Sequence, residues 1–95
     1  MSMNSQTREI MLILNEECAE IIVEICKCKR FGLHSKNLDE KLTHIEKLAK
    51  ELGDMLAMVD LLLDQKLFTR DQLDQYKQEK IEKLKRYSNI KITNK

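Results

Sequence analysis

Two short acidic clusters lie inside the two most apolar segments of this 95-residue chain, where carboxylates are costly to place. The clusters are Glu16-Glu17-Cys18-Ala19-Glu20 and Glu51-Leu52-Gly53-Asp54. On a helix, residues three positions apart project from one face. Each cluster therefore presents one pair of carboxylates, Glu17 with Glu20 and Glu51 with Asp54. If the pairs converge, their mutual repulsion requires a strong positive charge between them.

A divalent cation is the simplest source of that charge. Carboxylate oxygens are hard ligands, which suit Mg²⁺, with Mn²⁺ as an alternative, and do not suit zinc. Protein-bound Mg²⁺ commonly keeps several waters and takes phosphate oxygens of a substrate into its shell. The two acidic pairs therefore predict a helical, Mg²⁺-dependent site for phosphate chemistry.

The first of the helices that would position these carboxylates is expected over residues 10 to 31, where apolar residues recur at helical spacing. Ser5 or Thr7 would cap its start, and Gly32 supplies its stop. We expect its acidic face to border the apolar stripe without crossing it. That face consists of Glu17, Glu20 and Glu24, continued by Lys27.

A second helix is expected over residues 38 to 65, with Asn37 and Glu40 as its capping pair. Residues 55 to 63 are apolar nearly all round, which predicts a central position and contact with another subunit. Gly53 lies inside this helix, where glycine costs about 1 kcal/mol relative to alanine. Its presence suggests a close approach of another helix beside the acidic pair.

A third helix is expected over residues 70 to 88, because Thr69 and Gln72 form a capping box at its start. Its lysines alternate with glutamates, which is typical of a solvated face. The chain is therefore predicted to be all-α, a bundle of three main helices. We expect one domain over residues 1 to 95, with an ordered core over about residues 7 to 88 and a polar tail after residue 89.

The length and charge of the chain indicate which kinds of partner to expect. A domain of this length would bury only about two-thirds of the surface that its unfolded form exposes. We therefore expect a homo-oligomer, a dimer or a tetramer, which completes the core. The formal net charge is +1, so the overall balance does not suggest a nucleic-acid-binding protein. No apolar run reaches the roughly 18 residues of a membrane span.

The thiols and imidazoles are not predicted to carry chemistry. Cys18, Cys26 and Cys28 are odd in number and lie on one predicted helix, which fits neither a disulfide framework nor a zinc site. Reduced cysteines and the lack of a leader segment predict a cytoplasmic protein. His34 lies in a predicted loop and His44 on a charged helical segment, so both are expected at the surface.

The order of these motifs resembles the MazG-like branch of the all-α nucleoside triphosphate pyrophosphohydrolases, particularly short single-domain members of the kind found in phages. The resemblance covers about residues 10 to 85. It rests on E-E-x-x-E, on Lys27-Cys28-Lys29-Arg30-Phe31-Gly32, and on E-L-G-D ahead of an apolar run. Such enzymes depend on Mg²⁺ and convert (d)NTPs to monophosphates and pyrophosphate. Thirty residues separate Glu20 from Glu51, which is longer than the usual gap and leaves the path of residues 32 to 45 open.

The resemblance implies a role for each residue that matches a motif. Its metal ligands would be Glu17, Glu20, Glu51 and Asp54, and Glu17 or Glu20 would also serve as general base. Glu16 matches the first glutamate of E-E-x-x-E and is grouped with the substrate-binding residues. Lys27 and Arg30 match a basic pair that would bind the triphosphate. The implied reaction is in-line attack of a water on phosphorus.

Two other function classes stay open at this point. A non-enzymatic helical interaction module would use the apolar second helix to bind a partner, with its acidic residues only paired to lysines. A regulatory relative would bind nucleotide without turnover. No Gly-rich P-loop is present, so a Walker-type phosphate site is not predicted.

Overall fold

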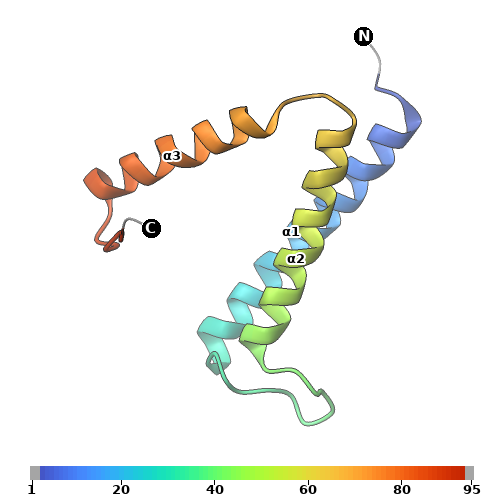
Figure 1. Ribbon diagram of the computed structural model, residues 1–95. Helices are drawn as coiled ribbons and strands as arrows, with labels where there is room; N and C mark the ends of the chain where they lie inside the picture. Colours follow the sequence, from blue (N-terminus) through green and yellow to red (C-terminus); the bar gives the residue numbers. More distant parts are fainter. Residues whose placement is uncertain (1–2, 94–95) are drawn as a thin grey trace. The chain divides into compact units, whose positions relative to one another are not determined.

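The computed structural model describes residues 3 to 93, and throughout these residues the regular structure is helical, with no strand (Figure 1). The three helices are α1 (Ser5–Phe31), α2 (His44–Asp64) and α3 (Arg70–Tyr87). The predicted all-α class and the three helices are thereby confirmed. The chain divides into two compact units, Met1–Gln65 and Lys66–Lys95.

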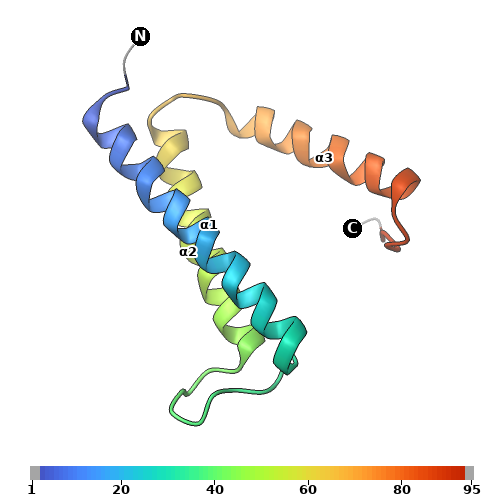
Figure 2. The same ribbon diagram turned by 180° about the vertical axis from the view of Figure 1, so that it is seen from behind.

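In the first unit, α1 and α2 lie side by side and antiparallel, joined by residues 32 to 43 (Figures 1 and 2). At the open end of the pair, the Thr7 hydroxyl donates a hydrogen bond to Gln65 Oε1 at 2.9 Å. At the loop end, the backbone N–H of Ile45 donates to the Leu33 carbonyl, also at 2.9 Å. These two contacts fix the register of the pair along its whole length.

The seam between α1 and α2 follows a seven-residue repeat, as in a coiled coil. Buried and half-buried positions recur at alternating spacings of three and four. In α1 they are Thr7, Ile10, Leu14, Glu17, Ile21, Glu24 and Cys28. In α2 the repeat consists of His44, Leu48, Glu51, Met55, Met58 and Leu62, continued by the C-cap Gln65, and other half-buried residues of α2 flank it. Glu17 and Glu24 thus lie within the seam, and the prediction that the acidic face only borders the packed stripe was wrong for both.

The start of α1 differs from both predicted caps. Asn4 is the N-cap, and its Oδ1 accepts a hydrogen bond from the backbone N–H of Thr7 at 2.7 Å. Thr7 does not cap, because its own hydroxyl is buried in the seam and donates to Gln65. The end of α1 agrees with the prediction, since Gly32 follows Phe31 and its N–H donates to the Cys28 carbonyl.

The start of α2 corrects the prediction by six residues. Thr43 is the N-cap and forms a capping box with Glu46, which satisfies two donors reciprocally. Asn37 and Glu40 do pair, with Asn37 Nδ2 donating to Glu40 Oε1 at 3.0 Å, but they close an isolated turn in the loop. The stronger reciprocal cap therefore decides where the helix begins.

His44 corrects the prediction of a surface position. It is the most completely buried large side chain among the described residues, with 2% of its surface exposed. Its ring lies 5.7 Å from that of Phe31, centroid to centroid, and its Nδ1 is buried without a hydrogen-bond partner. The position begins the seam repeat of α2, which explains its burial. His34, in contrast, is exposed as predicted.

The second unit contains α3, which begins at the predicted capping box of Thr69 and Gln72. No residue of α3 is buried, and its charges form surface pairs such as Lys85 with Glu82 at 3.1 Å. The helix ends at Tyr87, one residue earlier than predicted, and Ser88 is its C-cap. The predicted tail is non-helical through residue 93, and its last two residues lie outside the described range, as do the first two of the chain.

The two glycines should respond oppositely to alanine. Gly32 has φ of +100°, a conformation that strains any side chain, whereas a Cβ on Gly53 would meet no atom within 4 Å. The predicted close helix approach at Gly53 is therefore wrong. We expect Gly53→Ala to stabilise the protein by up to about 1 kcal/mol and Gly32→Ala to destabilise it by about 1 kcal/mol or more. Urea unfolding measures both, and an equal response of the two would contradict this interpretation.

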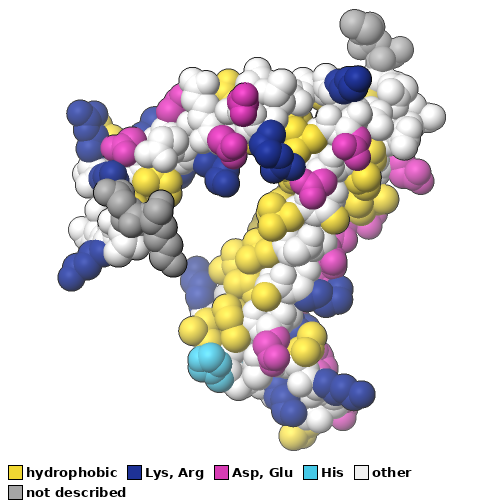
Figure 3. Space-filling model, viewed as in Figure 1, with side chains coloured by type: hydrophobic (Ala, Val, Ile, Leu, Met, Phe, Trp, Pro, Cys, Tyr) yellow, Lys and Arg dark blue, Asp and Glu magenta, His cyan; other side chains and the backbone are white. Residues whose placement is uncertain are grey.

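The apolar core of the first unit is thin. Among the described residues, the buried hydrophobic side chains are Ile10, Cys28 and Leu62. Much of the apolar surface of α1 and α2 stays exposed, including Ile22 at 63% and Leu56 at 56% (Figure 3). Cys18 and Cys26 are exposed free thiols. None of the described helices combines the length and the apolar character that crossing a membrane demands.

Candidate functional site: a cluster of carboxylates between two helices

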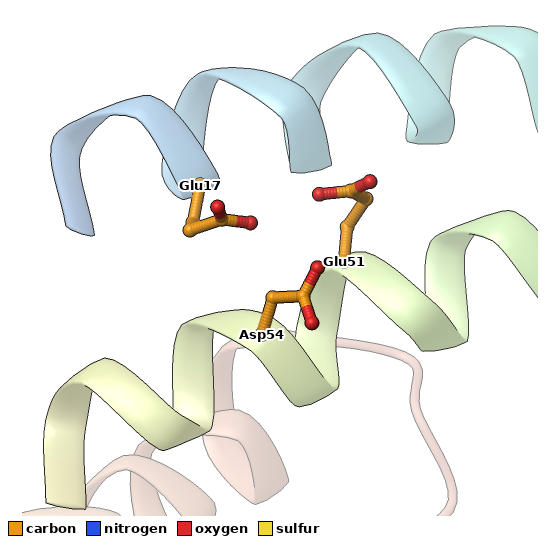
Figure 4. Close-up of side chains that lie close together, drawn as sticks. All are labelled: Glu17, Glu51 and Asp54. Carbon is orange, nitrogen blue, oxygen red and sulfur yellow. The ribbon is translucent and has the colours of Figure 1, made fainter. Parts of the chain in front are cut away.

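Three carboxylates from α1 and α2 meet across the seam. Glu17 comes from α1, and Glu51 and Asp54 come from successive turns of α2 (Figure 4). One carboxylate oxygen from each lies within 4.8 Å of the other two. All three residues are half-buried. We call Glu17, Glu51 and Asp54 the acidic cluster.

Glu20, the fourth predicted ligand, lies outside this cluster and is exposed. The reason is the seam repeat, which runs from Glu17 to Ile21 and Glu24 and so turns Glu20 away from α2. Glu20 lies one residue before the seam position Ile21, about 100° around the helix axis from it, and so falls outside the seam. The geometry thus brings together three of the four predicted ligands.

The surroundings of Glu17 in the acidic cluster raise the pKa of its carboxyl. Burial raises the pKa of its carboxyl, and a hydrogen bond with Glu51 and the negative charges of Asp54 and Glu51 raise this pKa further. Lys50 opposes these effects and lowers it in part. One oxygen, Oε2, is buried without a hydrogen-bond partner. A cation placed among the three carboxylates would relieve the repulsion and pair this oxygen.

Lys50 is the cation that the chain itself supplies. Its Nζ lies 3.0 Å from Asp54 Oδ2 and 3.9 Å from Glu51 Oε1. The hydrogen bond to Asp54 is the main reason that the pKa of Lys50 is raised. The side chain is 59% exposed, so it can leave the cluster without disturbing the seam. Lys50 was not among the residues predicted from the sequence, although its spacing of four from Asp54 is that of a helical ion pair.

The acidic cluster has the donor set of a hard divalent cation. Three carboxylate oxygens approach one another closely enough to share one ion, and their partial exposure leaves room for water. Thiol and imidazole groups, which zinc prefers, are missing from this described group. The residues therefore fit Mg²⁺ or Mn²⁺.

The residues predicted to bind substrate all lie on α1. Glu16 is exposed, at the solvent side of the turn that carries Glu17. Lys27 Nζ lies 3.6 Å from Glu24 Oε1. The guanidinium carbon of Arg30 lies 5.3 Å from the centre of the Phe31 ring, a cation–π contact. Lys27 and Arg30 therefore have partners at the loop end of α1.

Replacing Glu17 by glutamine should make metal-free stability less dependent on pH. The pKa of Glu17 is higher in the folded state than in the unfolded state. As the pH rises from the unfolded pKa through the folded pKa, Glu17 ionises and the folded state loses stability. Glu17→Gln is therefore expected to raise the melting temperature at neutral pH in EDTA, with the gain shrinking below the ordinary pKa of glutamate. Thermal unfolding at several pH values measures this. Glu16→Gln, an exposed neighbour, is the control, and an equal gain in both variants would contradict the assignment.

Comparisons with known proteins add no relative to this chain. No protein-family model, no curated protein sequence and no solved structure matches it.

Proposed function

We propose that this protein is a Mg²⁺-dependent nucleoside triphosphate pyrophosphohydrolase, which cleaves the bond between the α and β phosphates. The observation that carries the proposal is the meeting of Glu17, Glu51 and Asp54 across the α1–α2 seam. The motif resemblance to MazG-like enzymes supports the substrate class. The products would be a monophosphate and pyrophosphate, in keeping with housekeeping of the nucleotide pool.

In this proposal, Glu17, Glu51 and Asp54 hold the cation. Bound Mg²⁺ would lower the pKa of a water and offset the charge that develops on the leaving pyrophosphate. Glu20 stays the proposed fourth ligand or general base, at the exposed edge of the turn that carries Glu17. Glu17 is the alternative base, as the motif resemblance implies.

The substrate side of the site is proposed to lie along α1. Glu16, on the exposed edge, would face the nucleoside, and Lys27 and Arg30 would neutralise phosphate oxygens. Arg30 must leave the ring of Phe31 to do so. Since Phe31 is itself exposed, a base can stack on it once Arg30 has moved.

The direct test measures pyrophosphate release from a panel of dNTPs and NTPs with Mg²⁺. Turnover that is lost in Glu20→Gln and in a variant of the acidic cluster supports the hydrolase. Nucleotide binding without turnover in the wild type would instead support a regulatory protein.

We also propose that the protein is a homo-oligomer, a dimer or a tetramer. Ile22 and Leu56 are more than half exposed in the single chain, whereas the buried apolar core is small. A second copy that covers these residues would remove apolar surface from water, at about 25 cal/mol per Å². Sedimentation equilibrium measures the assembly, and a monomer at all concentrations would overturn this part of the proposal.

The same exposed apolar side chains favour the second candidate, a non-enzymatic interaction module. In that case a different helical protein would cover α1 and α2, and Lys50 would be the permanent partner of Asp54. The two candidates differ in the metal, because a module predicts no change in Mn²⁺ binding when the acidic cluster is altered.

A further inference from the structure

A second charged cluster lies between α1 and α2, closer to the connecting loop than the acidic cluster. Glu24 is 4% exposed, and its Oε1 lies 3.6 Å from Lys27 Nζ and 3.8 Å from Lys47 Nζ. Its Oε2 is buried and has no hydrogen-bond partner. Both distances are longer than a hydrogen bond. Glu24 therefore attracts the two ammonium groups by charge, and their N–H donors stay available to another acceptor.

Glu40 reaches this cluster from the loop. Its Oε2 lies 2.6 Å from Lys47 Nζ, and Asn37 Nδ2 donates to its Oε1 at 3.0 Å. The hydrogen bond from Lys47 lowers the pKa of Glu40, and the bond from Asn37 adds to this effect. A carboxylate oxygen of Glu40 thus already contacts the Lys47 ammonium group, as a phosphate oxygen would.

The two clusters lie along one face of the helix pair. Lys47, Glu51 and Asp54 are spaced by four and three residues and therefore share one side of α2. Glu17 and Glu24 are seven apart and share one side of α1 in the same way. One helical turn, about 6 Å for four residues, separates Lys47 from Glu51. This separation is close to the reach of a triphosphate chain.

Each cluster also contains an internal counterion of the opposite charge. Lys50 neutralises part of the acidic cluster, and Glu40 neutralises part of the lysine pair. Both side chains are partly exposed, whereas Glu24 is buried. A ligand that carries a cation at one end and phosphate oxygens at the other can displace both counterions at once.

We propose that Lys27 and Lys47, positioned by the buried Glu24, form the subsite for the terminal phosphates of the substrate, and that Glu40 occupies this subsite in the free protein. The identity of the ligand as a nucleoside triphosphate rests on the proposed function, whereas the anion subsite rests on the lysine pair alone. Lys47, which the motifs did not indicate, thus joins Lys27 and Arg30 among the residues proposed to bind the phosphates.

The test titrates inorganic tripolyphosphate into the full chain by calorimetry, in EDTA so that no metal contributes. Lys47→Gln is expected to weaken binding by about tenfold, since it removes charge-assisted hydrogen bonds. Lys47→Arg keeps the charge and should stay within about threefold of the wild type. Glu40→Gln should tighten binding by about threefold, because a competing anion is removed. The matched control is Lys41→Gln, because Lys41 is exposed and lies in the loop that carries Glu40.

Two results would overturn the subsite. One is a loss of affinity in Lys47→Gln that does not exceed the loss in Lys41→Gln, which would indicate that Lys47 contributes no more than unspecific surface charge. The other is unchanged or weaker binding in Glu40→Gln. Circular dichroism checks each fold, and Lys47→Arg and Glu40→Gln, which keep a cation beside Glu24, decide the question if Lys47→Gln unfolds.

The experiments can contradict the proposed subsite and the proposed hydrolase activity independently of each other. Turnover that depends on the acidic cluster, together with unchanged tripolyphosphate affinity in Lys47→Gln, would overturn the subsite and leave the hydrolase standing. Tripolyphosphate binding that requires Lys47, in a protein that hydrolyses no nucleotide, would support the subsite and overturn the hydrolase.

Discussion

Replacing Asp54 by asparagine is expected to reduce nucleotide turnover and Mn²⁺ affinity by more than about a hundredfold. Loss of an outer-shell partner of a metal ligand already costs about 10- to 100-fold, and Asp54 is proposed as a ligand itself. Asparagine keeps the size of the side chain but removes the charge that balances the cation. Pyrophosphate release gives the turnover, and the electron paramagnetic resonance signal of free Mn²⁺ gives the affinity.

The folded state should survive this change. Asparagine loses the ion pair with Lys50, which is exposed and contributes little, and it also removes a negative charge beside Glu17 and Glu51. Asp64→Asn makes the same substitution at an exposed position of α2 and should alter neither measurement. Wild-type turnover in Asp54→Asn would overturn the proposed metal site.

Replacing Leu62 by alanine is expected to have the largest effect on stability. Leu62 is 5% exposed and is one of few buried apolar side chains in the seam. Buried Leu→Ala changes cost about 2–5 kcal/mol, while a whole domain has about 5–15 kcal/mol of stability. In a chain of this length, such a loss lowers the melting temperature by roughly 10 °C or more.

Leu61 provides the matched control, because it is the adjacent leucine of α2 and is 40% exposed. Leu61→Ala should change the free energy of unfolding by less than about 1 kcal/mol. Thermal and urea unfolding of both variants, at the same protein concentration, measure the difference. Equal losses would mean that Leu62 does not lie in the seam between α1 and α2.

Local signals in the sequence predicted the ends of the helices where one residue or one residue pair decides them. Thr69 and Gln72 form the cap of α3 within four residues, and Gly32 alone permits the backbone that ends α1. The start of α2 was misplaced because the sequence offers two successive capping pairs, Asn37 with Glu40 and Thr43 with Glu46. The Thr43 box prevailed over Asn37 and Glu40, which form only a turn.

The amino-acid sequence by itself determined the three helices and the residue types that could bind a cation. Helical periodicity tells which side chains share a face, and so it paired Glu51 with Asp54 correctly. It does not tell which face meets another helix. Since α1 carries apolar residues on more than one side, the choice between Glu20 and Glu24 for the seam was open.

Only the tertiary structure decided that choice. The antiparallel register of α1 and α2 buries Glu24 and His44, exposes Glu20, and brings Lys47 to Glu24. These contacts join residues more than fifteen positions apart, so no local pattern encodes them. The charge of a cluster depends on which side chains approach from the facing helix, and that is a property of the packed pair.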